Sequence, residues 1–90
     1  MNGHSELGVR RTARVLVAED ETRVAHFIRR ALAEEGFAVD LCGDGNKALD
    51  LIQVTRFDAI VLDVMLPGRD GLSVLKTLRS RSISKPRVAL

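Results

Sequence analysis

Three acidic residues directly follow two short apolar runs of the chain. Glu19 and Asp20 come after Val15–Ala18 (VLVA), and Asp63 comes after Ala59–Leu62 (AIVL). Short continuous apolar runs are typical of strands in a parallel sheet, where helices cover both faces. Functional groups collect at the carboxyl ends of such strands. The three carboxylates are therefore candidates for a common site.

Carboxylates that lie close together repel one another, and a divalent cation relieves this repulsion. Neighbouring strands lie about 4.8 Å apart, so Glu19, Asp20 and Asp63 would meet if their two strands are neighbours. Ligand sets made of oxygen alone select a hard ion such as Mg²⁺. An Asp beside such an ion can attack phosphorus and form an acyl phosphate. Asp63 is best placed for that attack.

The segment between the two acidic sites has the pattern of alternating helices and strands. A helix is predicted after Glu21, because apolar side chains recur on one stripe and Gly36 can cap its end. An edge strand is predicted at Val39–Leu41, and Asp44 can cap a second helix. The stripe of the first helix consists of Val24, Phe27, Ile28, Ala31 and Leu32, and the inward residues of the second are Ala48, Leu49 and Ile52.

The remainder of the chain continues this alternation. Asp70 is a candidate cap for a third helix, with Leu72, Leu75 and Leu78 near one face, before residues 80–85 break the pattern. Pro86 closes that loop, and Arg87–Leu90 is predicted to open a fourth strand. The order of elements predicts an α/β domain with a parallel sheet and right-handed crossovers. Arg69, in the loop after Asp63, is interpreted as a solvated side chain.

The composition predicts one small, marginally stable domain. The chain has 90 residues and a net charge of +2, a balance that gives no indication of a nucleic-acid or membrane partner. Cys42, the single cysteine, is interpreted as a small core residue in a reducing compartment. No apolar run is long enough to span a membrane, so a cytoplasmic protein is expected. Residues 1–13 are polar and are predicted to form a flexible tail that precedes the domain at residues 14–90.

Three segments resemble the receiver domain of two-component response regulators. Their sequences are most similar to those of the winged-helix regulator subfamily. They are RVLVAEDE (14–21), DGNKAL (44–49) and FDAIVLDVMLPGRDGL (57–72). The resemblance covers residues 14–90. It implies a flavodoxin-like, doubly wound parallel α/β sheet with the strand order 2-1-3-4. The family's fifth strand and last helices would lie beyond Leu90, so an incomplete, truncated receiver is expected.

Carried over by position, the resemblance implies a role for four residues. Asp63 would accept a phosphoryl group from a partner sensor histidine kinase, and Asp20 would bind Mg²⁺ directly. Glu19 would assist through water, and Met65 would offer its backbone carbonyl to the ion. Such a chain accepts a phosphoryl group and is not a turnover enzyme. The loop residues Pro67, Gly68 and Gly71 would shape the site, and a tight turn joining strand to helix explains them equally well.

Two other functions remain open on the sequence. Receiver domains carry a Ser or Thr after the fourth strand and a Lys after the fifth, and both positions would lie beyond Leu90. The chain could therefore be a protein-interaction module without phosphotransfer, which self-associates or swaps domains through an exposed sheet edge. A phosphatase of the haloacid dehalogenase type also places an Asp after a buried strand. That family requires a second Asp at the position of Met65, which disfavours it.

Overall fold

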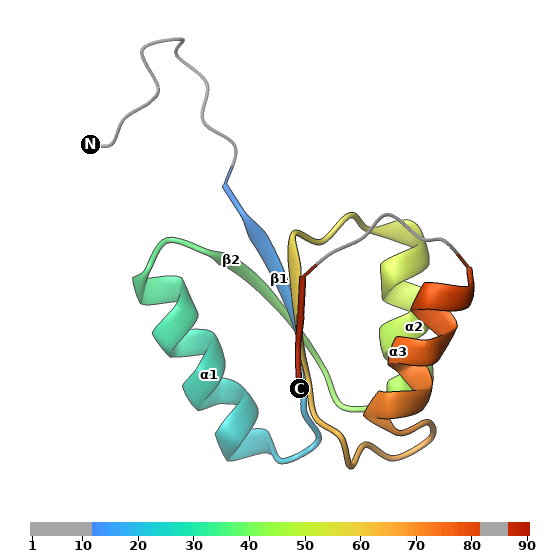
Figure 1. Ribbon diagram of the computed structural model, residues 1–90. Coiled ribbons are helices and arrows are strands. Elements are labelled where there is room, and N and C mark those ends of the chain that lie inside the picture. Colours follow the sequence, from blue (N-terminus) through green and yellow to red (C-terminus); the bar gives the residue numbers. More distant parts are fainter. Residues whose placement is uncertain (1–11, 82–86) are drawn as a thin grey trace, which may run out of the picture.

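A computed structural model of the chain describes residues 12–81 and 87–90, so most of the predicted tail and of the loop before Pro86 lies outside the described residues. The elements alternate between strand and helix (Figure 1). They are β1 (Arg14–Ala18), α1 (Thr22–Glu34), β2 (Ala38–Cys42), α2 (Gly45–Val54), β3 (Ala59–Leu62), α3 (Gly71–Ser80) and β4 (Arg87–Ala89).

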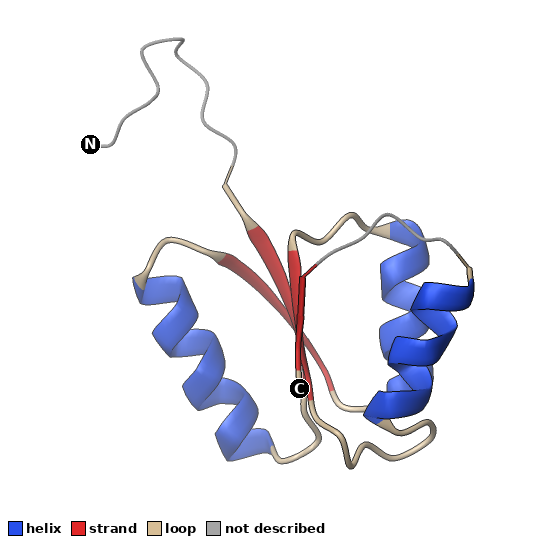
Figure 2. Cartoon of the chain, viewed as in Figure 1, coloured by secondary structure: helices blue, strands red, loops and turns tan. Residues whose placement is uncertain are grey.

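The described strands form one parallel sheet in the order β2-β1-β3-β4 (Figure 2). Ala18, the last residue of β1, is level with Cys42 on one side and with Leu62 on the other. The sheet order 2-1-3-4 expected from the resemblance is confirmed. Since β1 and β3 are neighbours and end at the same level, the residues that follow them leave the sheet side by side.

The main core lies between the sheet and the pair α2 and α3 (Figure 1). Its fully buried side chains include Leu16, Ile60, Leu62 and Val74, and α2 contributes the predicted residues Ala48, Leu49 and Ile52. The predicted face of α3 is partly wrong, because Leu72 is 49% exposed and Val74 is buried instead. Leu72 lies in the first turn of α3, close to the edge of the core.

The other side of the sheet is thinly covered, because α1 lies there alone among the described helices (Figure 1). The predicted helix is confirmed, but its apolar stripe is not a buried face: Phe27 is 72% exposed and Val24 is 42% exposed, while Ala25 is buried. The expectation that β3 is buried on both faces is also wrong. Ala59 and Val61 are only half-buried, because they alternate with Ile60 and point away from the core.

Acidic side chains cap each described helix. Asp44 accepts hydrogen bonds from the amides of Asn46 (2.7 Å) and Lys47 (3.1 Å) at the start of α2. Asp70 accepts from the amide of Ser73 at the start of α3, and Glu21 caps α1 in the same way. Gly36, at φ +94°, ends α1 in the left-handed region. The predicted caps are confirmed, and Glu21 is an additional one.

Cys42 is buried at the end of β2, with 7% of its surface exposed, so its interpretation as a core residue is confirmed. Burial raises the pKa of its thiol, because the thiolate would lose its hydration, while a hydrogen bond to the Asp44 backbone acts in the opposite direction. Cys42 should therefore be a protonated and unreactive thiol in the folded chain.

We expect Cys42 to react with iodoacetamide about tenfold more slowly in the folded chain than in the urea-unfolded chain. The reaction is run at a pH near the ordinary thiol pKa of about 8.5. Because the folded pKa is the higher one, the stabilising contribution of this thiol is complete below its ordinary pKa. It is lost as the pH rises through the folded pKa. Mass spectrometry of the alkylated chain measures the rates, and equal rates in both states would contradict a buried thiol.

Candidate functional site

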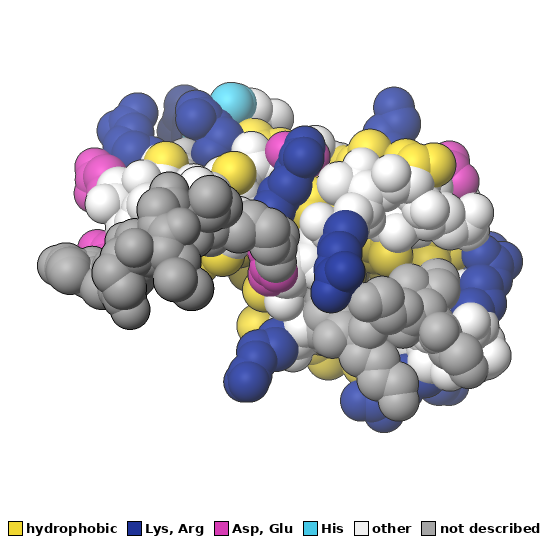
Figure 3. Space-filling model, turned by 90° about the horizontal axis from the view of Figure 1, so that it is seen from above, with side chains coloured by type: hydrophobic (Ala, Val, Ile, Leu, Met, Phe, Trp, Pro, Cys, Tyr) yellow, Lys and Arg dark blue, Asp and Glu magenta, His cyan; other side chains and the backbone are white. Residues whose placement is uncertain are grey.

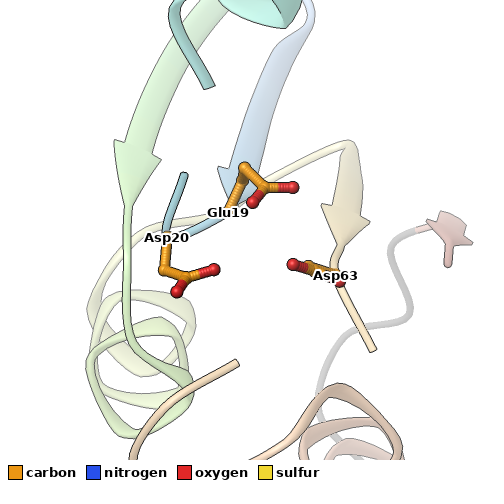
Figure 4. A group of neighbouring side chains, drawn as sticks. All are labelled: Glu19, Asp20 and Asp63. Carbon is orange, nitrogen blue, oxygen red and sulfur yellow. The ribbon is translucent and has the colours of Figure 1, made fainter. Parts of the chain in front are cut away.

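The carboxylates of Glu19, Asp20 and Asp63 meet at the carboxyl end of the sheet (Figure 4). Each offers an oxygen, and these oxygens lie within 4.8 Å of one another. Glu19 and Asp63 are half-buried and Asp20 is exposed. The convergence predicted from the sequence is therefore present in the structure.

The sheet itself places two of these residues. The Glu19 amide donates to the Cys42 carbonyl (2.9 Å), and the Asp63 amide donates to the Ala18 carbonyl (3.0 Å). Both hydrogen bonds extend the strand ladders by one residue beyond the ends of β1 and β3. The backbone of Glu19 and of Asp63 is thus an extension of the sheet, and the two residues leave it at fixed positions.

Backbone amides orient two of the carboxylates. Glu19 Oε2 accepts from the amide of Glu21 (3.0 Å), and Asp63 Oδ1 accepts from the amide of Met65 (3.1 Å). Each bond occupies one oxygen and leaves the second for another partner. No Lys or Arg of residues 12–81 and 87–90 forms an ion pair with these carboxylates; the pair Arg14–Asp40 lies at the opposite end of β1. The cluster therefore has negative charge that no described cation offsets.

The loop between β3 and α3 begins directly at Asp63 and contacts it through the Met65 amide. Leu66 is buried in the core, whereas Met65 is 82% exposed and contacts Asp63 through its backbone amide. The amide of Gly71 donates to the Val64 carbonyl (2.9 Å) and closes the loop onto the start of α3. Gly68 has φ +77°, a left-handed conformation that glycine adopts without strain. The predicted turn residues thus form the turn.

Arg69 is not the merely solvated side chain that the sequence suggested. Its Nε donates to Asn46 Oδ1 (3.1 Å) and its Nη1 donates to Ser73 Oγ (3.2 Å). The guanidinium thereby links the first turn of α2 to that of α3. This contact could not be predicted from the pattern of residues, because Asn46 lies 23 positions earlier and is brought close only by the fold.

The donor set of this site fits a hard divalent cation. Its side-chain ligands are carboxylate oxygens alone, without sulfur or imidazole, and they are gathered closely enough to share one ion. Mg²⁺ bound by few protein ligands keeps several waters, and the exposed Asp20 leaves room for them.

A family model for the response regulator receiver domain matches residues 15–90. Among curated proteins, the transcriptional regulatory protein DltR of Streptococcus agalactiae serotype III (strain NEM316) is 44% identical over 77 residues. The match includes 86% of this chain but only 34% of DltR. The chain thus spans about a third of the length of this curated relative.

Solved structures show the same fold. The receiver domain of the Francisella response regulator 1452 matches with a TM-score of 0.81 and 42% identity, over 86% of this chain and 63% of that chain. The response regulator TrrA of Thermotoga maritima, solved in complex with Mg²⁺ and BeF, matches with a TM-score of 0.75 and 31% identity. That match covers 78% of this chain and 61% of TrrA. With its sheet order and its match over residues 15–90, the chain belongs to the response regulator receiver family.

Proposed function

We propose that this chain is a phosphoacceptor in two-component signalling, and that Asp63 receives a phosphoryl group from a partner histidine kinase with the aid of Mg²⁺. The observation that carries the proposal is the group of three carboxylate oxygens within 4.8 Å of one another, directly after two neighbouring strands. The relative TrrA, crystallised with Mg²⁺ and BeF, supports the choice of ion.

The geometry supports a division of roles among the acidic residues. Asp20 and Asp63 would bind Mg²⁺ directly, since Figure 4 shows their carboxylates pointing toward each other. Glu19 would act through water, which is the role that the resemblance to receiver domains implies for this position. The Met65 backbone carbonyl would complete the protein ligands. When bound, Mg²⁺ would neutralise the charge that develops on the transferred oxygens.

In the proposed reaction, a carboxylate oxygen of Asp63 attacks the phosphorus of a phosphohistidine. The bond from phosphorus to the imidazole nitrogen breaks, its electron pair stays on that nitrogen, and an acyl phosphate forms on Asp63. The Met65 amide, bonded to Oδ1, holds the carboxylate in one orientation. Such orientation lowers the barrier, because the nucleophile is already aligned when the donor arrives.

Incubation with acetyl phosphate and Mg²⁺ tests this proposal without the kinase. Intact-mass spectrometry should show one added phosphoryl group. No adduct should form when the incubation contains EDTA in place of Mg²⁺. Borohydride reduction of the adduct followed by peptide mapping should locate the acyl phosphate at Asp63. Absence of an adduct at every concentration of acetyl phosphate and Mg²⁺ would refute phosphotransfer by this chain.

The metal roles predict unequal effects of two substitutions. Asp20→Asn removes a direct ligand and should weaken Mg²⁺ binding by about 30-fold, whereas Glu19→Gln removes a partner acting through water and should weaken it by about tenfold or less. Calorimetric titration with Mg²⁺ measures both. Glu34→Gln, on the exposed surface of α1, is the matched control. A larger loss for Glu19→Gln than for Asp20→Asn would reverse the assigned roles.

The wider setting is also part of the proposal. We propose a signalling domain at residues 14–90, preceded by a tail at residues 1–13, which acts in the cytoplasm and is not a turnover enzyme. None of the described helices has the length and apolar character needed to cross a membrane. The net charge of only +2 supports the expectation that this chain alone does not bind nucleic acid, and Figure 3 shows Lys and Arg side chains at several separate places on the visible face.

We further propose that the chain self-associates or swaps domains through its exposed sheet edge, and that its thinly covered side contributes apolar surface to the contact. β4 is an edge strand of the described sheet, and on the thinly covered side Phe27 and Val24 expose apolar surface on α1. Light scattering should show a mass that increases with concentration, and Phe27→Asp should shift the chain toward monomer. Gln53→Asp, at an exposed position of α2, makes the same change in charge and is the control. A monomer at all concentrations would contradict self-association.

A further inference from the structure

The loop after Asp63 is packed against the first turn of α2 through glycine. The Gly45 amide donates to the Pro67 carbonyl (3.0 Å). A Cβ atom at Gly45 would collide with the backbone carbonyl of Arg69, and would lie 2.6 Å from its carbonyl carbon. Real Cβ atoms do not approach backbone so closely, so one of the two segments would have to move. The close contact between loop and helix therefore depends on glycine at position 45.

A second contact joins the same two segments. A Cβ atom at Gly68 would lie 2.7 Å from Asp44 Oδ1 and 2.8 Å from its Cγ. The Asp44 carboxylate cannot easily move away, because Oδ1 accepts the amides of Asn46 and Lys47 as the cap of α2. The Asp44 carboxylate thus both caps α2 and packs against Gly68. The hydrogen bond from Arg69 to Asn46 adds a third link.

Met65 has no packed side chain of its own to fix its position. Its side chain is 82% exposed, so its backbone is held only by its neighbours and by the bond from its amide to Asp63 Oδ1. Before it, Val64 is fixed by the Gly71 amide. After it, Leu66 is buried and Pro67 accepts the Gly45 amide. The position of the Met65 backbone is therefore set in part by α2.

We propose that Asp44 and Gly45 are positioning residues, and that the first turn of α2 sets the distance of the Met65 backbone from Asp63. The inference rests on the proposed function, in which the Met65 carbonyl is a ligand of Mg²⁺. Neither residue touches the ion or the phosphoryl group in this arrangement. They act through the loop, and displacement of α2 weakens metal binding while the acidic residues remain intact.

Gly45→Ala tests this inference against Gly43→Ala as the matched control. Gly43 lies in the same connection, and a Cβ there would make only ordinary contacts of 3.5 Å or more with Asp20 and Glu19. Gly43→Ala therefore adds a methyl group beside the acidic residues without displacing the loop. The rate of phosphorylation by acetyl phosphate is measured across a range of Mg²⁺ concentrations. In Gly45→Ala the half-saturating Mg²⁺ concentration should rise about tenfold, as for loss of a residue that orients a ligand, while the maximal rate is largely recovered. Gly43→Ala should stay within about twofold of the wild type.

A rescue experiment separates positioning from loss of fold. Gly68→Ala should also raise the half-saturating Mg²⁺ concentration, and adding Asp44→Ser should reverse much of that rise, since Ser keeps a capping oxygen but removes the clashing carboxylate. Gly36→Ala introduces a similar left-handed strain, at φ +94° compared with +77°, with no atom within 4 Å. It should change thermal stability without changing the Mg²⁺ dependence. No rescue in the double variant would overturn the role of Asp44.

The metal-free protein gives an independent readout. In amide NMR spectra without Mg²⁺, Gly45→Ala should shift the resonances of Met65 and its loop neighbours, while Gly43→Ala should leave them in place. Unchanged loop resonances, or an unchanged Mg²⁺ dependence in a folded Gly45→Ala variant, would overturn the inference. A wild type that forms no adduct would refute the proposed function alone, because the NMR comparison still tests whether α2 positions the loop.

Discussion

Replacing Asp63 with Asn is expected to reduce the phosphoryl adduct formed with acetyl phosphate and Mg²⁺ to background, a loss of about 100-fold or more. Asn keeps the shape of the side chain and an oxygen to accept the Met65 amide, so the loop should keep its conformation. It lacks the anionic oxygen that attacks phosphorus. The substitution therefore removes the nucleophile with little change to its surroundings.

Intact-mass spectrometry measures this loss, with Asp50→Asn as the control. Asp50 is exposed on α2, so its variant should form the adduct as the wild type does. Two results would contradict the assignment. An adduct retained in Asp63→Asn would place the acceptor elsewhere, and steady release of phosphate from unrelated phosphoesters would indicate a phosphatase. The phosphatase alternative already lacks the second Asp, because Met65 occupies that position.

Ile60→Ala is expected to lower the free energy of unfolding by about 2–5 kcal/mol. Ile60 is fully buried in β3, level with Leu16 of β1 and Val88 of β4. Truncation leaves a cavity between the sheet and the two helices α2 and α3. Small domains are stable by only about 5–15 kcal/mol, and one side of this sheet is thinly covered. The variant should therefore unfold at a clearly lower urea concentration than the wild type.

Urea unfolding followed by circular dichroism measures this effect, because the chain has neither Trp nor Tyr for fluorescence. Val54→Ala is the control: Val54 ends α2 with 81% of its surface exposed, and its truncation should change stability by no more than about 0.5 kcal/mol. Equal losses for the two variants would contradict the placement of the core between the sheet and α2 and α3.

The parts of the fold that were predicted from sequence depend on local chemistry. The caps Asp44 and Asp70 and the stop at Gly36 act on backbone within a few residues of themselves, so the sequence shows them directly. The strands were evident from their apolar runs. The order of the strands was predicted from the resemblance, because hydrophobic periodicity does not reveal which strands pair with each other.

The parts that were missed depend on which segments meet in space. The stripe of α1 has a helical period, but period alone does not reveal that Phe27 lacks cover. From the sequence, Arg69 is interpreted as a solvated loop cation, and only the fold brings Asn46 beside it. In the same way, the sequence places Gly45 at the start of a helix, directly after its predicted cap. Only the fold shows that the loop between β3 and α3 leaves no room for a side chain there.

Because the Glu19 and Asp63 amides extend the strand ladders at the ends of β1 and β3, the site and the centre of the sheet form one structural unit. Their amides can then exchange with solvent only when the sheet itself opens, and the repulsion among the carboxylates opposes the closed sheet. A cation that binds only the folded chain adds stability in proportion to RT ln(1 + [L]/Kd). Under the proposed function, the Mg²⁺ concentration around the chain would thus regulate how often its sheet opens, before any phosphoryl group is transferred.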